Sequence, residues 1–370
     1  MDKLAFELLT EIVGLACDDG GYTACSLLQT CRHLHDAVRP IRFRSIALAP
    51  APTARRSFME NVELFVACLQ RERAALRGTG TASRVRHLFL SAVAPTRAPQ
   101  AGPDAEPDPP PPAAAPDLAL ARSPVADLLR AVADEVETLT FIGFPGGGQH
   151  LYLGPLEFTA LRELTIDDTV GDVLLWGDSH TAHPELPPVE YPVLERLHCY
   201  MGNAPFSLSG KTFPLTHLRL SECSSLYIGD TWTHLVNVTC RHDETWVFPS
   251  IEQIIVQPRP PPPSSPSPSD HAPNRFNYYI TLLQTWAGLH SCPLPCYFLG
   301  PSEHVAPGRV EEPDEFQRRI AWQAKEHWLS RLRGGDGCWA VKPEQARRAQ
   351  KGARPPVYLV PREFLSNFAE

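Results

Sequence analysis

The sequence predicts an α/β fold with three parts: an N-terminal module of three helices, an irregular array of parallel strands and a helical C-terminal cap. The first observation is a six-residue apolar pattern that occurs eight times between Phe43 and Val256. The second is the helical spacing of apolar residues between the early copies, and the third is the same spacing within residues 1–45. Repeated strands that follow one another favour a solenoid-like array.

The segment LAFELLTEIVGLAC, residues 4–17, has more apolar residues than one face of a helix can hold. One stripe consists of Leu4, Leu8, Ile12 and Leu15. A second stripe beside it consists of Phe6, Leu9, Val13 and Ala16. A helix near a chain terminus usually has one neighbour inside its own domain. The second stripe therefore predicts a second neighbour, which we expect to be another protein.

A turn with two glycines, DDGGYTA, follows the first helix, and two short helices fit the next segment. Pro40 predicts that the last helix ends by Arg39. The apolar residues of this segment recur at the intervals of a buried helical stripe, and they are Leu27, Leu28, Cys31, Leu34 and Val38. A unit of about 40 residues is near the lower limit of independent stability. We therefore expect it to pack on something else.

Residues Leu4 to Leu48 resemble the F-box, and in particular the F-box-like N-terminus of large families of fungal proteins. The resemblance lies in Leu-x-x-Glu-Leu-Leu-x-x-Ile, then an acidic glycine turn, then Cys-x-Leu and Cys-Arg-x-Leu-His. In that family the helices bind the adaptor subunit of an SCF ubiquitin ligase, which connects a substrate receptor to the cullin. The family usually has proline after the first leucine, where this chain has Ala5.

Carried over position by position, the resemblance implies an adaptor-binding surface on the first helix. The adaptor contacts would be Leu4, Phe6, Leu8, Leu9 and Ile12, with Leu27, Leu28 and Leu34 joining them or filling the core of the module. The alternative is a helical cap on the next domain that has no partner. Exposure of the first stripe would distinguish the two, because a cap would bury it.

The repeated pattern resembles the strand half of leucine-rich repeats, LxxLxL. Its copies begin at Phe43, Val85, Val136, Leu161, Leu194, Leu215, Leu235 and Ile251. The last two apolar positions of each copy alternate as in a strand with one buried face. The usual asparagine after the strand is mostly missing and the spacing is irregular, so we expect a degenerate, curved array over residues 46–256.

Helices should connect the early strands. Ser57 and Glu60 form a capping-box pattern, and Ser123 with Pro124 predicts the start of another helix. A proline-rich insertion lies near residues 95–120, and a Pro/Ser-rich linker spans 257–275. The remaining residues, 276–370, are expected to form a helical cap over the open end of the array, with helices near 276–289 and 313–333 and a short strand at CYFLG.

The composition excludes several other classes of protein. A net charge of -8 disfavours nonspecific binding to nucleic acid or to an anionic membrane. No apolar run is long enough to span a membrane, and no signal peptide is evident, so we expect a cytoplasmic or nuclear protein. We expect most of the ten cysteines to be small core residues. The segments SGKT and HSCPLPC lack the context of a phosphate-binding loop and a zinc site, so no cofactor or metal is predicted.

These features favour a substrate-receptor subunit of an SCF-type ubiquitin ligase, which binds the adaptor through residues 1–45 and a protein target through the concave surface of the array. The receptor would perform no chemistry, and its contribution would be proximity. A repeat scaffold without a ligase role is the alternative. An enzyme is the third possibility, but no local catalytic signature supports it. The identity of the target cannot be read from the sequence.

Overall fold

The computed structural model describes residues 4–50, 56–77, 83–94, 123–144, 156–167, 189–200, 214–223, 250–259, 296–299, 311–341 and 346–348. These residues form an α/β fold with parallel strands in chain order. The chain divides into two compact units. Unit 1 contains residues 1–161, 177–190 and 313–337, and unit 2 contains residues 162–176, 191–312 and 338–370.

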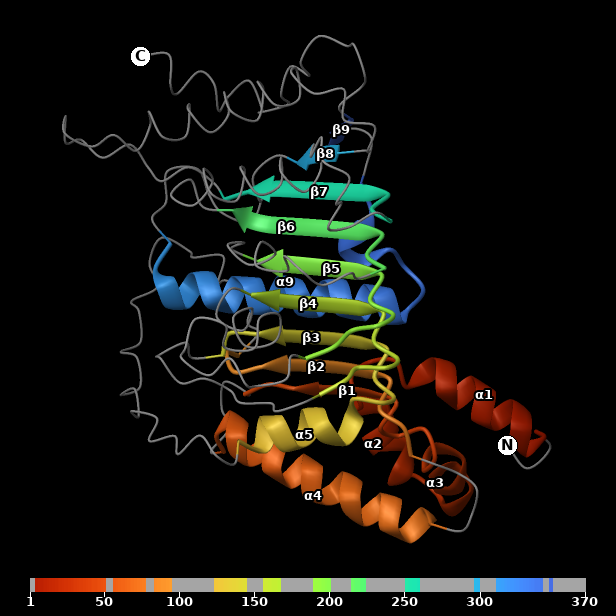
Figure 1. Ribbon diagram of the computed structural model, residues 1–370. Helices are drawn as coiled ribbons and strands as arrows, with labels where there is room; N and C mark the ends of the chain where they lie inside the picture. The colour runs from red at the N-terminus through yellow and green to blue at the C-terminus, as the bar shows by residue number, and fades with distance from the viewer. Residues whose placement is uncertain are drawn as a thin grey trace, which may run out of the picture. The chain divides into compact units, whose positions relative to one another are not determined.

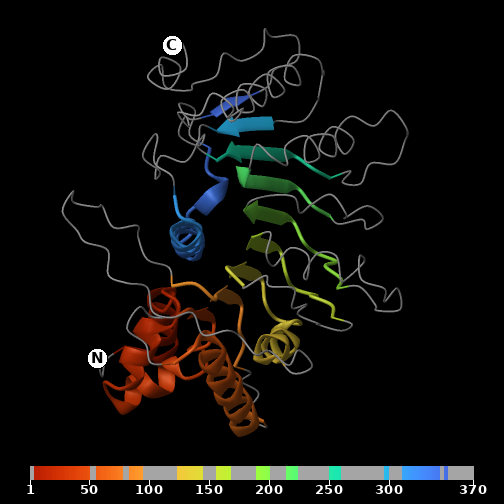
Figure 2. The ribbon, with the colours of Figure 1, turned by 90° about the vertical axis from the view of Figure 1, so that its left-hand side faces the viewer.

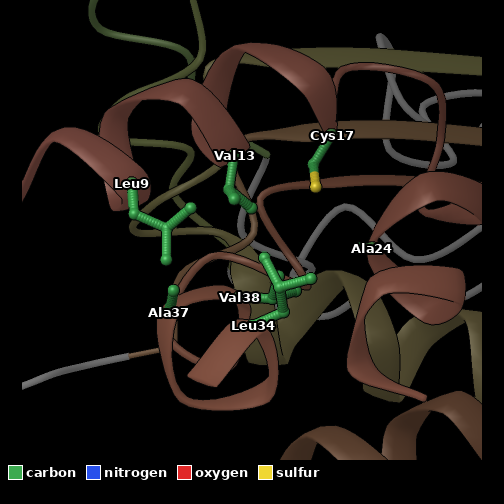
Figure 3. Packing of buried hydrophobic residues seen from close by; sticks show 7 residues of the cluster. All are labelled: Leu9, Val13, Cys17, Ala24, Leu34, Ala37 and Val38. Carbon is green, nitrogen blue, oxygen red and sulfur yellow. The ribbon is translucent and has the colours of Figure 1, made fainter. Parts of the chain in front are cut away.

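Unit 1 begins with three helices: α1 (Phe6–Ala16), α2 (Tyr22–Leu28) and α3 (Arg32–Val38). The sequence predicted three helices here, and α3 ends two residues before Pro40, whose ring cannot continue a helix. The three helices pack around one apolar cluster (Figure 3). One expectation was wrong, because Cys31 is exposed at the start of α3 rather than buried on its inner face.

Three parallel strands follow in unit 1: β1 (Ser45–Leu48), β2 (His87–Ser91) and β3 (Thr138–Ile142). Helix α4 (Phe58–Leu76) connects β1 to β2, and α5 (Pro124–Val132) lies between β2 and β3 in the chain. Figure 1 shows α4 and α5 side by side, and the two helices pack against each other. Both helices lie where the sequence predicted crossovers.

The two predicted helix starts have different outcomes. The capping box of α4 is present, since the Glu60 amide donates to Ser57 Oγ at 3.2 Å and the Ser57 amide donates to Glu60 Oε2 at 2.7 Å. Pro124 occupies the first turn of α5 as predicted, but the Ser123 side chain makes no capping hydrogen bond. Proline suits the first helical position because the amide that it lacks would have no partner within the helix there.

Helix α9 (Pro313–Leu332) also belongs to unit 1, where it packs against β2 and β3. We expected this helix to cover the open end of the array, and that expectation was wrong. Ile320, Ala324 and Trp328 recur at four-residue intervals and are buried, and the Trp328 ring lies 5.8 Å from that of Phe89 in β2. Figure 2 shows α9 and α5 on opposite sides of β2 and β3.

Helix α9 ends in the sequence RLRGG, residues 331–335, whose two glycines terminate the helix. Gly334 has φ +79°, and the Gly335 amide donates to the Ser330 carbonyl at 2.9 Å, so the helix ends in a glycine cap.

Unit 2 contains four parallel strands of five to seven residues, β4 (Glu163–Asp167), β5 (Arg196–Tyr200), β6 (His217–Cys223) and β7 (Gln253–Pro258). The short strand β8 (Cys296–Leu299) extends them in parallel, and β9 (Ala346–Arg348) pairs with it antiparallel. Strand β9 was not predicted. A 3-10 turn, η3 (Gly337–Trp339), places Cys338 and Trp339 against these strands.

Seven of the eight predicted repeat copies become β1 to β7, and each strand begins two residues after the first apolar position of its copy. The buried leucines of neighbouring strands are in register, as in Leu164, Leu197 and Leu218. The copy at Leu235, the helix expected at 276–289 and both proline-rich tracts lie outside the described residues, apart from residues 257–259 at the start of the second tract. None of the described helices is long and apolar enough to cross a membrane.

Candidate protein-docking site

Helix α1 begins at Ala5, which lies at the capping position with φ -60° and ψ 140°. The Ala5 carbonyl accepts the first helical hydrogen bond from the Leu9 amide at 3.0 Å. Glu7 lies in the first turn, where its charge is favourable near the positive end of the helix dipole. The backbone angles of Ala5 are those that proline adopts, so alanine preserves the conformation expected from the F-box resemblance.

The turn between α1 and α2 depends on an acidic side chain and two glycines. The capping residue of α2 is Gly21, and Asp19 satisfies an amide of the first turn, since the Thr23 amide donates to Asp19 Oδ2 at 2.9 Å and the Thr23 hydroxyl donates to the same atom at 2.6 Å. Gly20 and Gly21 have φ values of +82° and +101°. A Cβ on Gly20 would lie 2.9 Å from Ala47 Cβ, so only glycine fits between the turn and β1.

One face of α1 packs into the three-helix module (Figure 3). Leu9 and Val13 are only 4% and 3% exposed, and they contact the cluster formed with α3. Cys17 completes this face, and burial raises the pKa of its thiol to about 11. The thiol is therefore neutral at physiological pH and packs as a small apolar group.

Another face of α1 is apolar and open. We call Leu4, Leu8, Ile12 and Leu15 the α1 stripe. Their side chains are 38%, 51%, 53% and 75% exposed. At about 100° per residue, the stripe is centred roughly 120° around the helix from the direction in which Leu9 and Val13 point. The two stripes that the sequence showed on this helix therefore differ, because Leu9 and Val13 of the second stripe form part of the module core and the first stripe does not.

Phe6 is also exposed, at 45%, but it lies outside the α1 stripe. Its ring meets the ring of His33 from α3 edge-on, with 6.0 Å between the ring centres. This contact extends the apolar surface from α1 onto α3.

The remaining predicted contact residues lie in or against the module core. Leu9 was predicted to contact the adaptor, and this is corrected by its burial among the module's own side chains. Leu34 is buried in the same cluster, while Leu27 and Leu28 are half-buried against it. Of the eight predicted residues, four are exposed at α1: Leu4, Leu8 and Ile12 in the α1 stripe, and Phe6 on another side of the helix.

Two exposed apolar residues were missed as site residues. Leu15 continues the α1 stripe three residues after Ile12, so its spacing was a sufficient signal. Tyr22, at the start of α2, is 66% exposed and lies 5.8 Å from the ammonium group of Lys325 in α9. Nothing in the local sequence could have indicated that contact, because it depends on where α9 packs.

The charge beside the α1 stripe is negative. Glu7 and Glu11 are exposed, and their helical positions place them along one border of the stripe. An anionic membrane or nucleic acid would be repelled by this border. A protein surface with an apolar centre and a basic rim would be complementary to it.

The module is fixed to the strands and to α4 by polar contacts. Glu72 of α4 accepts from Arg39 Nε and from Arg42 at 2.7 Å each, and its side chain is only 9% exposed. The hydrogen bond and charge of Glu72 raise the pKa of Arg39. The Ala47 amide of β1 also donates to the Gly20 carbonyl at 3.2 Å. These contacts hold the α1 stripe in a defined direction relative to the strands of unit 1.

In the described parts of the chain, no three histidine, cysteine, aspartate or glutamate side chains are arranged to hold a metal ion. No protein-family model, curated protein or solved structure matches this chain. The α1 stripe is therefore assigned from its geometry alone.

Proposed function

We propose that this protein is a substrate-receptor subunit of an SCF-type ubiquitin ligase. In this proposal the α1 stripe binds the adaptor, and the repeat array holds a protein target. The observation that carries the proposal is the exposure of Leu8 and Ile12 on a helix whose other face already forms the module core. A helical cap without a partner would bury these side chains, so their exposure favours docking.

The exposed apolar surface can supply part of the binding free energy of a specific contact. Full burial of a large apolar side chain contributes roughly 1.5–3 kcal/mol. Leu8 and Ile12 are about half exposed, so each can contribute roughly 1 kcal/mol or more on binding. With the rest of the α1 stripe and Phe6, the total is of the order of 5 kcal/mol before association costs, and contacts from the partner's rim would add to it.

The receptor would act by holding the target and not by chemistry. A target bound to the array and a conjugating enzyme bound through the adaptor and cullin would form one assembly, in which transfer to a target lysine becomes effectively intramolecular. The Glu72 contacts support this role, because a fixed direction between α1 and the strands of unit 1 restricts where the target can lie. A repeat scaffold without a ligase role would also use a docked partner, and the identity of that partner separates the two functions.

The test is capture of the adaptor by the full chain. We expect the Leu8→Asp, Ile12→Asp double variant to bind the adaptor at least about 100-fold more weakly, because two buried carboxylates would replace two apolar contacts. Leu64→Asp is the matched control, since Leu64 on α4 is 50% exposed, as Leu8 is, but lies outside the proposed surface. Its adaptor binding should be unchanged.

Two outcomes would count against this function. Equal adaptor binding by the double variant and the Leu64→Asp control would exclude the α1 stripe as the contact. Failure of the unaltered chain to bind any SCF adaptor, with another protein bound through the same stripe, would favour the non-ligase scaffold. The far-UV circular dichroism and melting temperature of each variant must match those of the unaltered chain.

A further inference from the structure

One face of the unit 2 strands is polar, although it is covered. We call Glu163, Arg196, His198, His217, Arg219 and Ser221 the polar face. In β4 to β6 these residues alternate with the core leucines, and the strand register aligns Glu163 with Arg196 and His217, and His198 with Arg219. His198, Arg219 and Ser221 are nearly fully buried.

The cover is a short turn from the chain itself. Trp339 is 7% exposed, and its indole N–H donates to Glu163 Oε1 at 3.0 Å. Arg219 donates to the backbone carbonyl of Cys338, to Gln257 Oε1 at 2.7 Å and to Ser221 Oγ at 2.9 Å. The turn thus presents one aromatic N–H and one carbonyl, and each meets a charged side chain.

Two histidines also lie against the indole, beside the apolar cluster that Trp339 forms with Ile255. The His217 ring lies 5.8 Å from the Trp339 ring and the His198 ring lies 6.3 Å from it, both in edge contacts. His198 Nε2 is 3.0 Å from Ser221 Oγ. Burial lowers the pKa of His217, so its ring is uncharged at physiological pH and suits contact with an aromatic side chain.

Unit 1 shows what a purely structural cover looks like. On the side of its strands that α9 covers, the row of Ala47, Phe89 and Thr140 is mostly small or apolar, and the row of Ser45, His87 and Thr138 is polar but carries no carboxylate or guanidinium group. In unit 2 the equivalent row contains His198 and Arg219, and the described cover is a turn with one large side chain. Burying charged groups is costly and is unnecessary for capping a sheet. The buried charged side chains of unit 2 are therefore those expected of a surface that binds a polar ligand.

We propose that the polar face is a peptide-binding surface for the target and that the Cys338–Trp339 turn occupies it as an internal ligand. This inference rests on the proposed function, because the partner is a segment of the target protein. The segment would carry a tryptophan whose N–H donates to Glu163, preceded by a backbone carbonyl that accepts from Arg219. A target would replace the turn by making the same two contacts and adding others along β4 to β6.

The arrangement also sets a preference among aromatic residues. Phenylalanine could occupy the space between His217 and His198, but it would leave the Glu163 carboxylate without the indole donor. A site built to accept a hydrogen bond discriminates strongly against a ligand that lacks the donor. We therefore expect tryptophan to be favoured over phenylalanine.

The test uses the full chain with Trp339→Ala and a fluorescent peptide of residues 336–342, in which serine replaces Cys338. We expect this variant to bind the peptide at least tenfold more tightly than the unaltered chain, whose own turn competes. The peptide with phenylalanine in place of Trp339 should bind at least fivefold more weakly. Adding Glu163→Ala to the variant should weaken peptide binding at least tenfold. Adding Glu195→Ala, an exposed carboxylate of unit 2 that pairs with Arg162, should leave it unchanged.

The inference would be overturned if the folded Trp339→Ala chain does not bind the peptide. Equal binding of the tryptophan and phenylalanine peptides, or no effect of Glu163→Ala, would also overturn it. If Trp339→Ala lacks a cooperative melting transition, Trp339→Phe replaces it, and we expect that variant to bind the peptide more tightly than the unaltered chain does. The adaptor takes no part in this assay, so its failure and the failure of the α1 experiment are distinguishable.

Discussion

Helices α1 and α5 are both short and rich in apolar residues, but they differ in what surrounds them. In α5 the apolar side chains from Val125 to Val132 are buried, because the helix packs beside α4 and close to the strands of unit 1. In α1, Leu9 and Val13 are buried, whereas Leu8 and Ile12 are half exposed. Among the described residues, α1 therefore leaves apolar surface uncovered where α5 does not, and this difference is the basis for proposing that α1 binds a partner.

The comparison predicts its largest effect for truncation of a buried leucine. Leu128→Ala in α5 should lower the free energy of unfolding by about 2–5 kcal/mol, because Leu128 is fully buried and its removal leaves a cavity. Leu8→Ala in α1 should change it by less than about 0.5 kcal/mol. Urea unfolding of the two variants measures the difference. A loss of more than 2 kcal/mol for Leu8→Ala would contradict the exposure of the α1 stripe.

Acid should weaken the interior of unit 1 through His87 in β2. Burial, with Arg44 and Arg86 nearby, lowers the pKa of His87 in β2 to about 4 from an ordinary value near 6.5. As the pH falls, the unfolded chain therefore takes up this proton before the folded chain does. The free energy of unfolding keeps the full contribution of the neutral His87 above pH 6.5 and loses it as the pH falls toward 4. The loss is of the order of 3 kcal/mol.

Comparison of two chains measures this effect, since carboxylates also titrate in that range. We expect the difference in unfolding free energy between the unaltered chain and His87→Gln to change between pH 7 and pH 4.5, with the variant losing less stability. A pH-independent difference would show that His87 takes up its proton equally in both states.

A smaller effect is expected where the module meets α4. Glu72→Gln should cost about 1–3 kcal/mol of stability, because Arg39 and Arg42 would lose a largely buried counterion. The exposed pair of Arg162 and Glu195 is the control, and Glu195→Gln should cost less than about 1 kcal/mol. Thermal unfolding of both variants measures this. Equal costs would mean that burial of the Glu72 carboxylate contributes nothing.

The smallest expected effect concerns the start of α1. Ala5→Pro should raise stability by about 0.4–1 kcal/mol, because the φ of -60° at Ala5 already suits proline and its carbonyl still accepts from the Leu9 amide. Differential scanning calorimetry would detect the change. Adaptor affinity should stay the same, and a large loss of affinity would show that Ala5 itself contacts the partner.

Much of the strand arrangement followed from the sequence, because each copy carries two alternating apolar positions that must face a core. The position of α9 did not follow. Its spacing of Ile320, Ala324 and Trp328 indicates a buried face but does not specify the surface that buries it. Strand β9, with the sequence Ala-Arg-Arg, has no strand pattern and forms through pairing with β8.

Only part of the candidate site was predicted, because an apolar pattern indicates a buried face but does not specify what buries it. Both stripes of α1 are apolar, so the sequence could not show which one packs on α3. Leu9 was assigned to the partner, although contact with α3 buries it. The polar face of unit 2 was missed, because its residues come from separate strands and meet Trp339 only after folding.

The most direct measurement is site-specific photo-crosslinking at single positions of the full chain. A photoreactive side chain placed at residue 8 or 12 should crosslink to the adaptor, and the same group at residue 64, which is equally exposed in the free chain, should not. Crosslinking of the adaptor at residue 64 but not at residues 8 and 12 would contradict the claim that the α1 stripe is the docking surface.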